Sequence, residues 1–134
     1  MTNEQLARYW MVAVGVALVA AGALGFVAGN PIASDDPGAL FLVNAAHNAV
    51  HLLTGLVALG IGLGSRGAGL ANGTIAFGVL YAIIGLLLIV DPRLFGLFAD
   101  APANEADHVL HGAIAIVSLV AGYLARGPLP APTR

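Results

Sequence analysis

The sequence predicts an all-α integral membrane protein, a four-helix bundle built from two tandem helical hairpins. Of its 134 residues, 59% are hydrophobic and 9% are charged, whereas a typical soluble domain is about 25% charged. The mean hydropathy is +0.91. The apolar residues also gather in four stretches long enough to cross a bilayer, which takes about 20 helical residues.

The four expected spans follow one another with short connections. They cover residues 10–28, 40–63, 70–90 and 106–125. Leu, Val, Ile and Ala dominate them without the period-two alternation of a barrel strand, so helices best satisfy their backbone groups in lipid. The first span is long for the apolar core of a signal peptide, and we expect it to be a retained helix.

The arginines predict the orientation. Four of the five lie in segments that share one side of a four-span chain: Arg8, Arg66, Arg126 and Arg134. The positive-inside rule places that side, with both termini, in the cytoplasm of a cell (inner) membrane. The domain then covers residues 1–126, followed by a short cytoplasmic tail at 127–134.

The opposite side is acidic, with one arginine, Arg93. Its acidic residues are Asp35, Asp36, Asp91, Asp100, Glu105 and Asp107. We interpret this rim as solvated loop charge, and the alternative is a funnel that attracts cations. The scarcity of basic residues excludes nucleic acid as a partner. The expected partners are the lipid bilayer and a second copy or a larger membrane complex.

An internal repeat relates the two hairpins, about 8–66 and 68–126. A shift of sixty positions lays NAAHNAVH over NEADHVLH, so that His51 matches His111. The same shift pairs Gly25 with Gly85 and Gly62 with Gly122. A duplicated hairpin is the simplest explanation, and its pseudo-two-fold axis would lie along the membrane normal.

All four histidines lie in these two motifs, near the outer ends of the second and fourth spans. Spacings of three and four residues put side chains on one helical face, so the two faces can converge on one ligand. The predicted metal ligands are His47, His51, Asp107 and His111. This set suits zinc, iron, manganese or copper. The predicted supporting residues are Asn44, Asn48, Asn104 and His108.

Other interpretations of these residues remain open. The polar groups could hydrogen-bond across the helix interface, each bond contributing about 1 kcal/mol or less. His47, His51 and His111 could hold haem or a chlorophyll-type pigment, with His51 and His111 as the symmetric haem pair, or form a proton relay. We expect a binding or structural membrane component rather than a hydrolase or transporter. The rival is a membrane-embedded metalloenzyme.

The motif N-x-x-H-N-x-V-H-L-x-x-G at 44–55, the loop L-F-G-L at 94–97 and the motif A-D-x-x-L-H at 106–111 together resemble a known family. It consists of small four-helix membrane proteins of bacteria and archaea, described as a domain of unknown function. The resemblance covers most of the chain and implies a fold and a membrane location, but no reaction. His108 falls where the resemblance leads us to expect a polar residue such as Asn.

Overall fold

The computed structural model describes residues 1–127 and confirms the predicted helical bundle. The long helices are α1 (Asn3–Leu24), α2 (Ala45–Gly64), α3 (Gly67–Val90) and α4 (Glu105–Ala125). Each is long and apolar enough to cross a membrane. The predicted tail lies, from residue 128 onwards, outside the described residues.

The helix ends differ from the expected spans for local reasons. The first helix begins at Asn3, because Thr2 and Gln5 form a capping box, and it ends at Leu24 rather than at residue 28. The second begins at Ala45 rather than at residue 40, because the side chain of Asn44 caps it by accepting a hydrogen bond from the His47 amide.

The connection between α1 and α2 adds an element that the all-α prediction did not include. The strands β1 (Ala33–Ser34) and β2 (Phe41–Leu42) pair in parallel. The side chain of Asn30 orders this loop. Its amide donates to the carbonyls of Leu24 and Ala33, at 2.8 and 2.6 Å.

Within each hairpin the two helices approach closely at glycines. A Cβ atom added to Gly15 of α1 would lie 2.9 Å from the Leu59 amide nitrogen of α2. A Cβ atom added to Gly78 of α3 would lie at the same distance from the Leu119 nitrogen of α4. Small residues at these contacts let the helix backbones meet, as is common between membrane helices.

These contacts show that the repeat offset is not constant. Leu119 follows Leu59 by 60 positions, but Gly78 follows Gly15 by 63. The predicted pairing of Gly25 with Gly85 is therefore wrong, whereas Gly62 and Gly122 each lie against the first helix of their own hairpin. The reason is that the connection at 25–44 is longer than the one at 91–104. The repeat offset between α1 and α3 therefore differs from the offset between α2 and α4.

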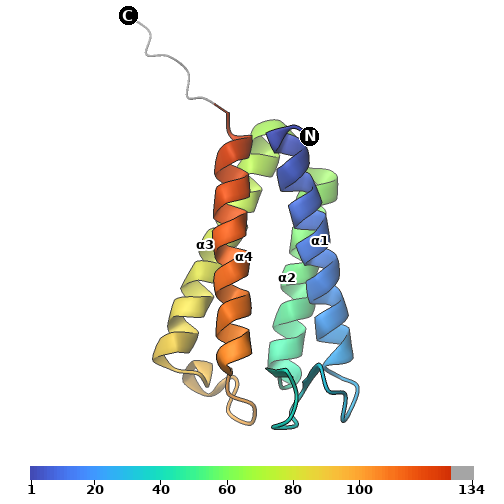
Figure 1. Ribbon diagram of the computed structural model, residues 1–134, viewed down its shortest axis with the longest axis vertical. Helices are drawn as coiled ribbons and strands as arrows, with labels where there is room; N and C mark the ends of the chain where they lie inside the picture. The colour runs from blue at the N-terminus through green and yellow to red at the C-terminus, as the bar shows by residue number, and fades with distance from the viewer. Residues whose placement is uncertain (128–134) are drawn as a thin grey trace, which may run out of the picture.

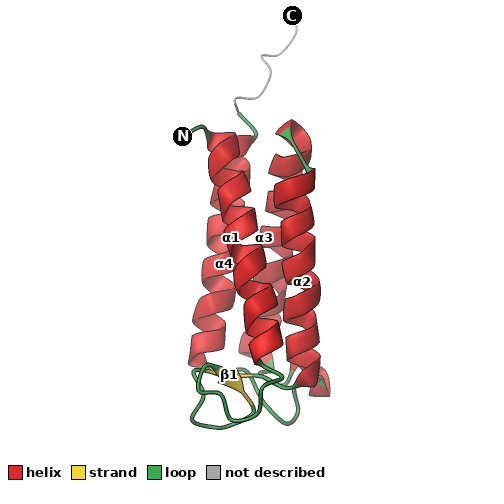
Figure 2. Ribbon diagram, turned by 90° about the vertical axis from the view of Figure 1, so that its right-hand side faces the viewer, coloured by secondary structure: helices red, strands yellow, loops and turns green. Residues whose placement is uncertain are grey.

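The bundle has two different ends (Figures 1 and 2). The N-terminus, the α2–α3 connection and the C-terminal end of α4 lie together at one end, and the two long loops lie at the other. At the first end, the Arg8 guanidinium donates to the carbonyls of Gly62 and Ser65, at 2.6 and 2.9 Å. This contact satisfies carbonyls at the C-terminal end of α2.

The apolar residues divide between the bundle interior and its outer surface. The central core consists of Met11, Val14, Leu18, Ala58, Phe77, Tyr81, Ile114 and Ala115. Large side chains such as Leu53, Leu86, Ile89 and Ile116 point outward and are each 65–66% exposed. Such a surface suits contact with lipid chains rather than with water.

Candidate metal centre

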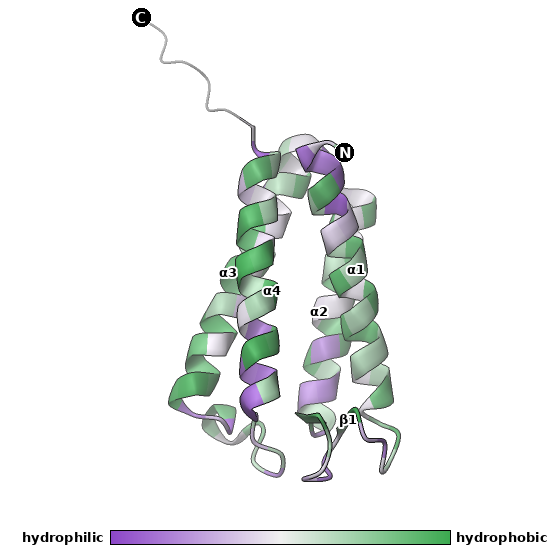
Figure 3. Ribbon diagram, in the orientation of Figure 1, coloured by the Kyte–Doolittle hydropathy of each residue, from purple (hydrophilic) through white to green (hydrophobic). Residues whose placement is uncertain are grey.

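Polar residues interrupt the apolar helices α2 and α4 close to the long loops (Figure 3). There His47 and His51 of α2 meet His111 of α4 inside the bundle. The three side chains are only 0%, 2% and 3% exposed. One ring nitrogen from each lies within 4.8 Å of those of the other two. The fold thus brings together three of the four predicted metal ligands.

Two asparagines position the histidine-bearing helix ends. Asn44 caps α2 and Asn104 caps α4, each accepting from the backbone amide three residues later. Each also reaches the loop of the other hairpin, because the Asn44 amide donates to the Leu97 carbonyl and the Asn104 amide to the Leu40 carbonyl, both at 3.0 Å. These crossed bonds tie the two helix ends to each other's loops.

His111 is oriented by its own helix. Its Nδ1 lies 2.7 Å from the carbonyl oxygen of Asp107. Because a carbonyl can only accept, this contact places the proton on Nδ1 and leaves the lone pair on Nε2. Metal-binding histidines are commonly oriented in this way by a carbonyl or carboxylate.

His47 and His51 lack such partners. Within residues 1–127, neither ring nitrogen of either side chain has a hydrogen-bond partner, although all four atoms are buried. Buried polar atoms are almost always paired, so an unpaired set points to a bound water, ion or ligand. The rings therefore do not form the interhelical hydrogen-bond network considered from the sequence.

Asp107 has a capping role that its predicted place among the metal ligands did not include. Its Oδ2 accepts from the backbone amide of Asn104 at 2.9 Å, which completes a capping box at the start of α4. Its carboxylate does not belong to the group of converging ligand atoms found in the described part of the chain. Asp107 serves the cluster through its carbonyl, which holds His111.

The other predicted neighbours also lie outside the cluster. The side chain of Asn48 packs against Gly25, where a Cβ atom would overlap its amide. His108 lines a groove between α3 and α4, together with Tyr81 and Gly85. Asn48 and His108 each lie one residue after a predicted ligand. This one-residue offset rotates both side chains around the helix, away from the three converging rings.

Two aromatic residues that the sequence reasoning missed enclose the histidines. The ring of Phe98 stacks on His47 with a centroid distance of 4.3 Å and an interplanar angle of 13°. Tyr81 lies 5.5 Å from His111 and shares a 2.8 Å hydrogen bond with Thr54. In the sequence, this contact was indicated by the position of Phe98 directly after the L-F-G-L motif. The conformation of the folded loop, however, is what places the Phe98 ring inside the bundle.

The loop before α4 places Phe98 through an unusual backbone. Leu94 and Phe95 have positive φ angles of 44° and 55°, a conformation that costs about 1–2 kcal/mol for residues other than glycine. The Asp91 carboxylate stabilises the loop by accepting from the amides of Arg93 and Phe95, at 3.0 and 2.8 Å.

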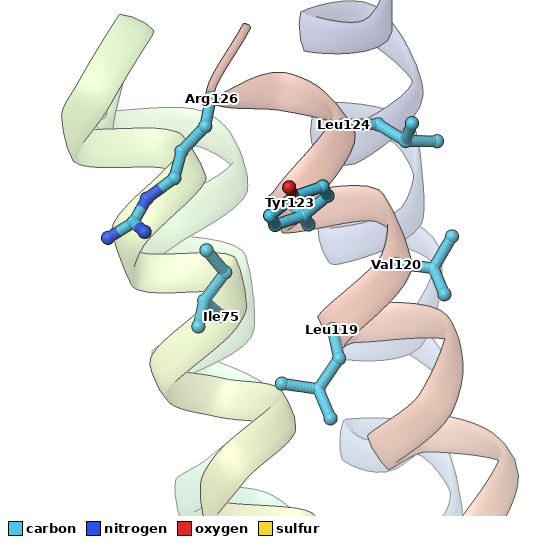
Figure 4. A pocket seen from close by; sticks show the side chains of 6 residues that line it. All are labelled: Ile75, Leu119, Val120, Tyr123, Leu124 and Arg126. Carbon is cyan, nitrogen blue, oxygen red and sulfur yellow. The ribbon is translucent and has the colours of Figure 1, made fainter. Parts of the chain in front are cut away.

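A separate hollow lies at the opposite end of the bundle (Figure 4). It is lined by Ile75 of α3 and, on α4, by side chains including Leu119 and Tyr123. Arg126 at its rim donates to the side-chain oxygen of Asn72 at 2.9 Å. The lining is otherwise apolar, as expected for a surface that lipid chains cover.

Fold and site together define a small four-helix protein with helices of membrane-spanning length and a buried group of three histidines. The chain belongs to the family described as domain of unknown function (DUF4383), whose model matches residues 8–124. This match confirms the resemblance seen in the sequence motifs. No curated protein and no solved structure matches the chain.

Proposed function

We propose that this chain is a multi-pass membrane protein that binds a divalent transition metal through His47, His51 and His111. The observation that carries the proposal is the convergence of three buried imidazoles, since one ring nitrogen of each lies within 4.8 Å of those of the other two. Both termini lie in the cytoplasm and the metal centre lies near the outer surface. The end that holds the N-terminus and the C-terminal end of α4 carries Arg8, Arg66 and Arg126, which supports this orientation.

The ligand set favours zinc or copper. Three neutral imidazoles suit these metals, and three protein ligands leave a fourth position open for water or another ligand. Zinc–nitrogen bonds of about 2.0–2.1 Å in a tetrahedron bring the nitrogens to roughly 3.3 Å from one another. From the present separations of up to 4.8 Å, the nitrogens would move closer by at most about 1.5 Å to reach that geometry.

Haem or a chlorophyll-type ring fits this arrangement poorly. The ring centroids of His51 and His111 are 6.2 Å apart. His47 lies 4.4 Å from His51 and 6.0 Å from His111, and Phe98 stacks on its other side. A planar macrocycle between His51 and His111 would have to displace His47, whereas a single ion requires no such space.

The direct test is zinc binding by the purified protein in detergent. We expect one zinc per chain, measured by elemental analysis after dialysis and by calorimetric titration. His51→Ala and His111→Ala should each weaken binding by at least about tenfold, since removing one of three ligands leaves an incomplete site. His108→Ala is the matched control, because His108 lies on the same helix beside the cluster and should leave the affinity unchanged.

The proposal is wrong if the wild-type protein binds no zinc or copper, or if His108→Ala weakens binding as much as His111→Ala does. An intense Soret absorption band in gently purified protein would indicate a tetrapyrrole instead. Orientation needs its own test. A cysteine at Asp36 should react with an impermeant maleimide from outside the cell, and one at Arg66 only after permeabilisation.

A further inference from the structure

A second polar site lies beside the first, in a pocket between the two long loops and the start of α2. Its wall includes Asp35, which follows β1, and Asp100, which precedes α4. Both aspartates are exposed. Asn48 of α2 lines the same pocket and is only 1% exposed. The pocket therefore combines two charged oxygen ligands with a buried amide.

The amide oxygen of Asn48 is the observation that distinguishes this pocket from ordinary loop charge. Oδ1 is buried and has no hydrogen-bond partner in the part of the chain that the structure describes. Gly25 makes room for the amide, since a Cβ atom there would overlap it. An oxygen held in this position without a partner is a ready ligand for a cation or its bound water.

Asp35 and Asp100 also differ from their acidic neighbours. Asp36 accepts from the Gly38 amide, and Asp91 accepts from two amides of its own loop. Among the hydrogen bonds and ion pairs of residues 1–127, none involves the side chain of Asp35 or Asp100. These two carboxylates are free to bind a ligand without disturbing the loops.

We propose that Asp35, Asp100 and Asn48 form a binding site for a divalent cation that prefers oxygen ligands, of the calcium type. Carboxylate and amide oxygens are the ligands of calcium, which tolerates irregular geometry and completes its coordination with water. The site contains no imidazole and so differs in chemistry from the histidine cluster. The residues of this site come from both hairpins, so a bound ion would bridge their loops.

The test is calcium binding by the full chain in detergent, measured by calorimetry at a constant ionic strength. The double variant Asp35→Asn/Asp100→Asn should raise Kd by about tenfold or more, because ligand charge sets calcium affinity. Asn48→Ala should raise it by about threefold or more. The control is Glu105→Gln, which removes one exposed negative charge from the same end of the bundle and should leave Kd within about twofold.

The helicity and the detergent-unfolding curve of each variant distinguish a loss of binding from a loss of folding. The two aspartates changed in the double variant are exposed, so their replacement leaves the core intact. The proposal is overturned if the wild type shows no saturable calcium binding or if Asn48→Ala leaves Kd unchanged. It is equally overturned if Glu105→Gln weakens binding as much as the double variant, which would mean that the acidic rim attracts calcium only diffusely.

Discussion

The His47→Leu substitution tests whether the histidine cluster exists for binding rather than for stability. His47 is 0% exposed and neither of its ring nitrogens has a partner within residues 1–127. Each buried, unsatisfied polar group costs about 1–3 kcal/mol. The substitution forfeits the stacking on Phe98, worth about 0.5–1.5 kcal/mol. Both ring nitrogens are relieved by the substitution, so with metal chelated the free energy of unfolding of the variant should be at least about 0.5 kcal/mol higher than that of the wild type.

Metal should shift this difference in favour of the wild type. At a free zinc concentration of one hundred times Kd, a site present only in the folded protein adds about 2.7 kcal/mol to the wild type. The variant lacks a ligand and should gain little. The assay is SDS-induced unfolding in mixed micelles, followed by circular dichroism, with and without zinc.

The matched comparison is His111→Leu under the same conditions. This substitution also removes the hydrogen bond from Nδ1 to the Asp107 carbonyl, so its metal-free gain should be smaller than that of His47→Leu. A His47→Leu variant that is less stable than the metal-free wild type by more than about 1 kcal/mol would refute the reasoning, because the ring would then be holding the helices together.

Three further predictions concern packing, capping and pH. Gly15→Ala should destabilise the bundle by about 1–3 kcal/mol in SDS unfolding, because its Cβ would meet backbone atoms of α2 at 2.9 and 3.0 Å, whereas Gly60→Ala, with open space around it, should be nearly neutral. Asn104→Ala removes both a cap and a bond to the Leu40 carbonyl, and should cost about 1 kcal/mol and loosen zinc binding in calorimetry. Zinc affinity should hold as the pH is lowered from 7.5 to about 5.5 and fall only at more acidic pH, since ligating imidazoles must be neutral and burial disfavours the charged imidazolium of these three side chains; an affinity that stays constant down to about pH 3 would argue against histidine ligands.

The sequence was informative about the histidines because helical periodicity is local. Spacing alone placed His47 and His51 on one face of α2, and the repeat placed His111 on the matching face of α4. The same reasoning did not reveal the local role of Asp107, whose carboxylate lies three residues after an asparagine cap and serves that cap through Oδ2. Whether a carboxylate forms a local hydrogen bond or binds a metal depends on which other side chains converge on it in the fold. Helical periodicity does not contain that information.

The repeat shows a second limit. Matching the conspicuous polar motifs gave a shift of sixty, which holds for the second helix of each hairpin. The first helices follow a shift of 63, as Gly15 and Gly78 reveal, because the two long loops differ in length. In sequences so rich in glycine and alanine, several offsets look alike, and only the packing contacts distinguish them.

The sequence by itself determined the architecture of this protein. Four apolar stretches of spanning length leave few arrangements that satisfy the backbone in lipid, and arginine placement breaks the symmetry between the two ends. The tertiary structure alone decided which polar groups meet. The stacking of Phe98 on His47, the crossed bonds of Asn44 and Asn104, and the pocket that Asn48 shares with Asp100 all join segments far apart in the chain. Such contacts depend on helix rotation and loop path, which interactions across the whole bundle set together.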